Sequence, residues 1–223
     1  MNFTSYSQTN YSEKALMGRG DLMLVGETIQ LQKEVFDAFD KMQEEALKEG
    51  ISIQIVSAYR SFDRQKSIWN KKFKSYILNG LTQQQAIDKI IEYSTIPGTS
   101  RHHWGTDIDI IDATIKAPKE LLLQKNYENT GVYVKLKEWM DLNAEKFGFY
   151  LVYDNNPLRK GFKYEPWHYS YREVSRIMLT KFKEIDLNQI LQRNDIKGKH
   201  LFSVKFIKKY RSAHILDINP KLD

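Results

Sequence analysis

The spacing of hydrophobic residues predicts several helices and a few short strands. Hydrophobic side chains recur at helical spacing over residues 27–49, and Gly50 follows where such a helix would end. Residues 51–57 instead alternate isoleucine with polar residues, which is the period of a half-buried strand. The same two periods predict helices at 63–78, 81–93 and 132–147, and strands within 147–153 and 167–171. Helices around a few non-adjacent strands, without regular alternation of strand and helix, favour an α+β fold.

The chain divides into three segments. Its 223 residues, of which 41% are hydrophobic and 28% charged, suit a single domain. We interpret the polar residues 1–26 as an arm that wraps the domain, with the GRGD sequence of residues 18–21 as a turn rather than an adhesion motif. Residues 27–175 form the predicted core, and residues 176–223 a C-terminal extension packed on it. Residues 197–211 mix basic with aromatic and aliphatic side chains; we interpret them as a surface element, with contact to an anionic wall polymer as the alternative.

Composition limits the chemistry that the chain can perform. The formal net charge of +6 suits a polyanionic neighbourhood, but no nucleic-acid-binding motif is recognisable, and we expect no nucleic-acid partner. The sequence has no cysteine, so a zinc site must use His, Asp or Glu, and five histidines are available. No signal peptide and no membrane span are recognisable, although a chain numbered after signal removal would look the same.

One short stretch places candidate metal ligands close together. In "GTSRHHWGTDIDI", residues 98–110, two histidines precede a glycine and two aspartates on alternate positions. Asp107 and Asp109 therefore share one face of a strand, while Ile108 and Ile110 share the other. The solvent face of an edge strand is the alternative interpretation. The glycine allows a tight turn, so that a histidine and a carboxylate can converge on one ion.

A later stretch offers a third ligand. "KYEPWHYSY" contains His168 with Glu165 three residues before it. Pro166 keeps Glu165 out of helical geometry, so a bend in the chain is needed to set both side chains at one site. An aromatic strand packed in the core explains the same residues equally well.

Together, three segments resemble a known family. "SAYRSFDRQ", "PGTSRHHWGTDID" and "EPWH" occur in this order, and residues 50–172 resemble the zinc D-alanyl-D-alanine carboxypeptidases of the VanY type. The combined pattern S-x-H-x6-D followed by E-x-W-H is highly specific. The resemblance implies a hedgehog/DD-peptidase-like α+β fold, in which helices flank a small, mainly antiparallel sheet.

The resemblance also implies a site and a cofactor. His102, Asp109 and His168 match the three Zn²⁺ ligands, and Glu165 matches the catalytic base. Two imidazoles and one carboxylate leave zinc a fourth position for water, whose pKa the ion lowers to about 7. Glu165 can then take a proton from this water and return it to the leaving amine.

The remaining matches concern the substrate and the surroundings of the ligands. Arg60 matches an arginine that faces the substrate and can stabilise the developing oxyanion; a salt bridge that closes the loop is the alternative. Ser100 and Gln65 match polar positions that hold the terminal carboxylate and backbone of the peptide. His103 or Asp107 could orient His102 from behind.

The chain also departs from the family pattern. The family often has a small residue at the position of Trp104 and a less acidic stretch than Thr106 and Asp107, so we expect a different pocket wall.

The resemblance implies hydrolysis of the terminal D-alanine from peptidoglycan stem peptides. An endopeptidase or an L,D-carboxypeptidase on the same fold is the alternative, and a non-catalytic zinc-containing wall-binding module is a second, against which the intact Glu165 argues. We expect a monomer that acts in the cell envelope, with a cytoplasmic location left open.

Overall fold

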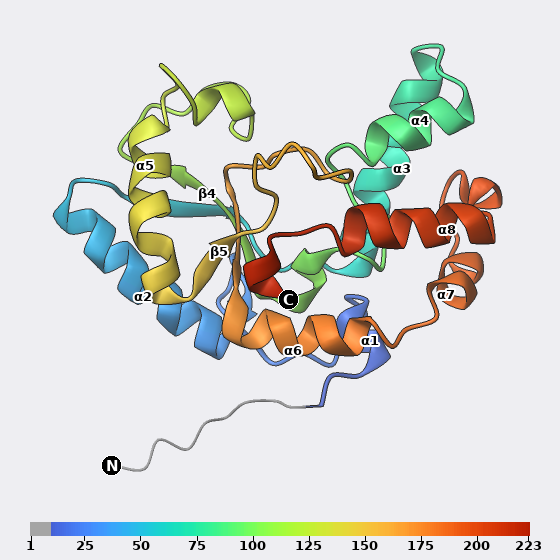
Figure 1. Ribbon diagram of the computed structural model, residues 1–223, viewed down its shortest axis with the longest axis horizontal. Helices are drawn as coiled ribbons and strands as arrows, with labels where there is room; N and C mark the ends of the chain where they lie inside the picture. Colours follow the sequence, from blue (N-terminus) through green and yellow to red (C-terminus); the bar gives the residue numbers. More distant parts are fainter. Residues whose placement is uncertain (1–9) are drawn as a thin grey trace.

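A four-stranded antiparallel sheet lies at the centre of the computed structural model, which describes residues 10–223 (Figure 1). The strand order is β3-β4-β6-β5. The strands are β3 (Ile53–Ser57), β4 (Asp107–Asp112), β5 (Phe149–Leu151) and β6 (His168–Tyr171). The α+β class and the antiparallel sheet are confirmed. Strand β4 lies between two partners and all six of its residues are buried, so it is not an edge strand with a solvent face.

Helices surround this sheet. The α-helices are α1 (Glu13–Leu16), α2 (Lys33–Lys48), α3 (Phe62–Leu78), α4 (Gln83–Ile90), α5 (Val134–Asn143), α6 (Arg172–Phe182), α7 (Leu187–Arg193) and α8 (Val204–Tyr210). Shorter helical turns are η1 (Arg101–Trp104), η2 (Gln124–Asn126), η3 (Ala144–Phe147), η4 (Lys199–Leu201), η5 (Arg211–Ile215) and η6 (Pro220–Leu222). In Figure 1, α2 and α5 lie toward one end of the molecule and α3, α4, α7 and α8 toward the other. None of the helices in residues 10–223 has the length and hydrophobicity that crossing a membrane requires.

The helix predicted over 27–49 begins later than its spacing suggested. Helix α2 starts at Lys33, because the preceding residues form a two-stranded ribbon of β1 (Leu24–Val25) and β2 (Leu31–Gln32). Leu31 continues the helical spacing of the sequence, but its backbone pairs with Val25. The backbone N–H of Gln32 also donates to the carbonyl oxygen of Gly105, at 3.0 Å. Tertiary pairing therefore overrides the local hydrophobic period here.

The described part of the N-terminal segment packs beside the motif of residues 98–110. Residues 1–9 of the predicted arm lie outside the described residues. The carbonyl oxygen of Leu16 accepts a hydrogen bond from the indole of Trp104 at 3.1 Å, and that of Gly18 accepts one from Phe62 at 2.7 Å. The GRGD sequence forms a turn in which Gly18, Gly20 and Asp21 have positive φ.

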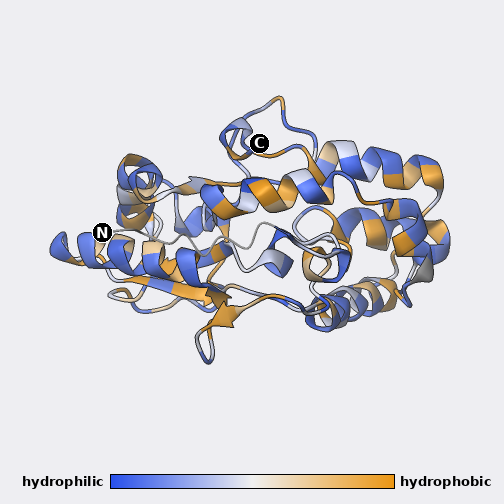
Figure 2. Ribbon diagram, turned by 90° about the horizontal axis from the view of Figure 1, so that it is seen from below, coloured by the Kyte–Doolittle hydropathy of each residue, from blue (hydrophilic) through white to orange (hydrophobic). Residues whose placement is uncertain are grey.

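The C-terminal segment contacts the segments around the motif. The indole of Trp69 on α3 donates to the carbonyl of Lys197 at 2.9 Å, and the Tyr210 hydroxyl accepts a hydrogen bond from the backbone N–H of Ile96 at 3.0 Å. Phe202 and Tyr210 are almost fully buried. Figure 2 shows hydrophobic residues concentrated in the strands, whereas the helices alternate hydrophobic with hydrophilic positions.

Candidate metal centre

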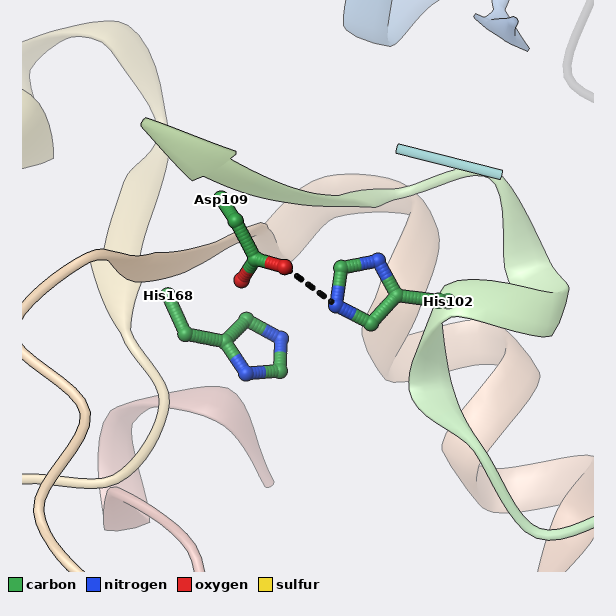
Figure 3. A group of neighbouring side chains, drawn as sticks. All are labelled: His102, Asp109 and His168. Carbon is green, nitrogen blue, oxygen red and sulfur yellow. Dashed lines mark ion pairs between the residues drawn. The ribbon is translucent and has the colours of Figure 1, made fainter. Parts of the chain in front are cut away.

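Three side chains from separate elements converge at one end of the sheet. His102 lies on η1, Asp109 on β4, and His168 begins β6, where it is the cross-strand partner of Asp109. Figure 3 shows them pointing toward one another. One possible ligand atom from each lies within 4.8 Å of the other two, and His102 Nε2 is 3.4 Å from Asp109 Oδ2. The structure therefore brings the three residues predicted as ligands together.

A left-handed glycine makes this convergence possible. Gly105, at the end of η1, has φ of 66°, and it turns the chain from His102 into β4. A Cβ atom at this position would lie 2.7 Å from the side chain of Leu24. The left-handed backbone therefore favours glycine here, and a larger residue would also force the Leu24 side chain to move.

The orientation of His102 leaves one nitrogen for a metal. Its Nδ1 lies 2.8 Å from the carbonyl oxygen of Ala58, which can only accept, so Nδ1 carries the proton. The unprotonated Nε2 then faces Asp109. Neither of the residues expected to orient His102 does so: Asp107 contacts His168, and His103 contacts the backbone of Arg60 and Gly98.

The donor set fits a zinc ion. Asp109 Oδ1 is buried and has no hydrogen-bond partner among the described residues, which is a costly state for a carboxylate oxygen unless a cation completes it. Two imidazoles and one carboxylate are a common zinc ligand set, and such a site keeps one position open.

Glu165 lies beside His168 because the chain bends between them. The backbone N–H of His168 donates to the carbonyl of Glu165 at 3.0 Å, which closes a turn around Pro166. This turn supplies the bend that the sequence alone left open. Glu165 Oε2 is 2.9 Å from His168 Nδ1. Burial lowers the pKa of His168, but hydrogen bonds to Asp107 and Glu165 outweigh burial and raise it to about 10.

Arg60 follows β3 and is held by neutral partners. Its guanidinium donates to Gln65 Oε1 at 2.8 Å and to Ser57 Oγ at 2.9 Å. Among the described residues no carboxylate lies within salt-bridge distance of it, which disfavours the loop-closing ion pair. Burial lowers the pKa of Arg60, and the charges of Asp109 and Glu165 oppose this shift.

His102, Asp109 and His168 face a cleft of about 550 Å³. Arg60, Ser100 and Glu165 line this cleft together with the three clustered residues. Gln65 differs from expectation: it is fully buried behind Arg60, and its amide donates to the carbonyl of Thr95 at 2.8 Å. The contacts of Gln65 therefore hold Arg60 in place. Trp104 does not line the cleft; it packs against Phe182 of α6.

Lys72 and Tyr153 are two of the cleft residues that sequence reasoning missed. Lys72 lies on α3 two helical turns after Gln65, and its ammonium donates to Ser94 Oγ at 2.6 Å. Burial lowers the pKa of Lys72, and the charge of Glu165 opposes that shift. The buried ring of Tyr153 stands edge-on to His168, with ring centroids 5.2 Å apart. Lys72 could have been found from the sequence, because seven residues are about two helical turns and place it on the same face of the helix as Gln65. No local pattern in the sequence indicated that Tyr153 lies at the cleft.

Comparison with known proteins identifies the family. The family model VanY, described as D-alanyl-D-alanine carboxypeptidase, matches residues 28–174, which is more than half of the chain. The chain belongs to this family. YodJ of Bacillus subtilis (strain 168) is 32% identical over 165 residues, which cover 73% of this chain and 54% of YodJ. The chain thus spans about half the length of this relative.

Two solved structures show the same fold. The vancomycin-resistance D,D-pentapeptidase VanY, solved in complex with Zn(II), has a TM-score of 0.56 at 24% identity; the match covers 77% of this chain and 90% of that one. The LD-carboxypeptidase LdcB has a TM-score of 0.50 at 27% identity, over 82% of this chain and 72% of LdcB.

Proposed function

We propose that this protein is a zinc carboxypeptidase that removes the terminal D-alanine from peptidoglycan stem peptides. The observation that carries the proposal is the convergence of His102, Asp109 and His168 in one cleft, with Glu165 beside them. Membership of the D-alanyl-D-alanine carboxypeptidase family supports the substrate. A zinc ion held by these three residues would supply Lewis-acid activation of water and of the scissile carbonyl.

The chain's own residues supply the proton transfers and the charge. Glu165 takes a proton from the attacking water and returns it to the nitrogen of the departing D-amino acid. Arg60, oriented by Ser57 and Gln65, offers a fixed cation to the developing oxyanion. Ser100 lines the same cleft and can hydrogen-bond the terminal carboxylate of the peptide.

We further propose that the protein acts as a monomer in the cell envelope. The three candidate ligands, Glu165 and Arg60 meet in one cleft within a single chain, which supports this proposal. The stem peptides of the wall are the substrates that the family description suggests.

An L,D-carboxypeptidase is the second candidate. The likeness to LdcB, at 27% identity, favours it. The two activities differ in the stereochemistry of the residue before the scissile bond.

Mass spectrometry of products from purified muropeptides, with and without a chelator, separates these candidates. Loss of one D-alanine from the pentapeptide stem indicates the D,D-activity, and loss from the tetrapeptide stem the L,D-activity. The proposal expects the D,D-product, and expects chelation to abolish its formation. Cleavage inside a cross-linked dimer without release of free D-alanine would indicate an endopeptidase and overturn the proposal.

A further inference from the structure

A cation without a carboxylate partner lies in the wall of the cleft. Among the described residues, the lysine and arginine side chains that line the cleft are Arg60, Lys72 and Arg101. The guanidinium of Arg101 forms a buried ion pair with Asp107 at 2.9 Å, so its charge is compensated within the protein. The ammonium of Lys72 donates to Ser94 Oγ at 2.6 Å, and no carboxylate of the described residues lies within salt-bridge distance of it. Its charge is therefore available to an anionic ligand.

Lys72 belongs to the same wall of the cleft as Arg60. Gln65 accepts a hydrogen bond from Arg60 and donates one to the carbonyl oxygen of Thr95 at 2.8 Å. Ser94, which holds the ammonium of Lys72, directly precedes Thr95. On α3, Lys72 follows Gln65 by a rise of about 10 Å along the helix axis. The two cations are therefore held in one framework, with Lys72 further along the cleft.

The ammonium lies near the groups that would act on the scissile bond. Burial lowers the pKa of Lys72, the charge of Glu165 opposes this shift, and the charge of Arg60 adds to it. Screening limits such effects between charges to roughly 10 Å. In the substrate of a carboxypeptidase, the free carboxylate lies one residue beyond the scissile bond, and one residue spans at most about 3.6 Å. A cation close to the catalytic groups, but not one of them, suits that carboxylate.

We propose that Lys72, oriented by Ser94, binds the terminal carboxylate of the peptide and so selects substrates with a free C-terminus. This inference rests on the proposed function, and it adds a charged partner to the neutral hydroxyl of Ser100. Hydrogen bonds between an ammonium and a carboxylate are stronger than those between neutral groups. A peptide that continues past this residue offers a neutral amide instead and leaves the ammonium without an anion. Lys72 therefore favours carboxypeptidase over endopeptidase cleavage.

The position of the ammonium argues against a purely structural role. A lysine that only packs its stem against a helix can keep its charged end in water. Lys72 is instead half-buried and turns its ammonium toward a hydroxyl of the cleft wall, where burial disfavours the charged form. An anion bound beside the ammonium would offset this cost.

Two matched peptides test the proposal: a stem pentapeptide with a free terminal carboxylate, and the same peptide with a terminal carboxamide. For the zinc-loaded full chain, kcat/KM should be about 10- to 100-fold higher for the carboxylate, which is the contribution of a charged hydrogen bond. Lys72→Met keeps the length of the side chain but removes its charge. It should lower kcat/KM for the carboxylate about tenfold or more, mainly by raising KM, and leave that for the amide nearly unchanged. Lys74→Met, on the exposed face of α3, is the matched control and should keep the wild-type preference.

Ser94→Ala provides a second variant that retains the lysine. Without the hydroxyl the ammonium is less well oriented, so the preference for the carboxylate should fall by a smaller factor than in Lys72→Met. Equal losses for the two peptides in Lys72→Met would assign the lysine to another part of the substrate or to the fold, and would overturn the proposal. A wild type that cleaves both peptides equally well would overturn it without any variant.

Binding measurements separate this inference from the proposed function. If D-alanine is released but Lys72→Met affects both peptides alike, the inference fails and the proposed function stands. If neither peptide is hydrolysed, the proposed function fails, and calorimetry with the same two peptides still tests Lys72. Tighter binding of the carboxylate peptide by the wild type than by Lys72→Met, with no such difference for the amide, would support the inference. Equal affinities would overturn it.

Discussion

His102 and His168 are each held by a hydrogen bond to a ring nitrogen. A backbone carbonyl, that of Ala58, holds His102, whereas the side chain of Asp107 holds His168. Burial raises the pKa of Asp107, but Arg101 and His168 outweigh burial and keep it well below its usual range. For His102, the contact with Ala58 leaves Nε2 facing Asp109.

Asp109 should be the carboxylate ligand of the zinc. Its unpaired, buried Oδ1 distinguishes it from Asp107, whose oxygens are both engaged. Asp109→Asn should therefore weaken zinc binding more than Asp107→Asn does, and His102→Ala should cause a comparable loss. Metal analysis after dialysis measures this. Loss of zinc in Asp107→Asn together with full zinc in Asp109→Asn would mean that the ligand assignment is wrong.

Arg60 should contribute more to catalysis than to the stability of the fold. Arg60→Lys keeps the charge but loses the planar fork that bonds Ser57 and Gln65 together. We expect kcat/KM to fall about tenfold or more while the melting temperature changes little. Arg64→Lys, on the exposed face of α3, is the matched control and should behave as wild type. A large drop in melting temperature with normal turnover would instead assign Arg60 a structural role.

At the scale of elements, the C-terminal extension supports the segments that carry the site. The ring of His214, on η5, packs against Phe162, which lines the cleft, with ring centroids 5.0 Å apart. It also stacks on Tyr210, whose hydroxyl contacts Thr99 just before Ser100. Neither contact could be predicted, because no local pattern in the sequence shows which distant segment His214 or Tyr210 packs against.

The packing of His214 should make stability depend on pH. Burial lowers the pKa of His214 to about 4, so the fold favours the neutral ring. The unfolded chain, with a pKa near 6.5, binds the proton more readily, so this stabilisation is complete above pH 6.5 and is lost as pH falls toward 4. His214→Phe keeps an aromatic ring without a titrating group. Between pH 7 and 4 the wild type should lose about 1–2 kcal/mol more unfolding free energy than this variant.

Denaturant titrations at the two pH values measure this difference. His200, a surface histidine on η4, provides the control, and His200→Phe should follow the wild type. Parallel stability profiles for the wild type and His214→Phe would contradict the prediction.

Across the whole molecule, the sequence predicted the central sheet and the three residues that meet in the candidate metal centre better than their surroundings. The alternation in 51–57 is a local signal for β3, and the short motifs around His102, Asp109 and His168 could be recognised in the sequence itself. The start of α2 and the contact between Asp107 and His168 depend on strand pairing between distant segments, which no local pattern carries.

Glu165→Gln tests the central claim most directly. The substitution preserves size and the turn around Pro166 but removes the basic carboxylate. Zinc content and melting temperature should stay close to those of the wild type if Glu165 acts as a base and not as a ligand, as we propose. Single-turnover release of D-alanine from a stem pentapeptide should fall by roughly two to four orders of magnitude. Undiminished release would contradict the account, and loss of zinc together with activity would show that Glu165 coordinates the ion.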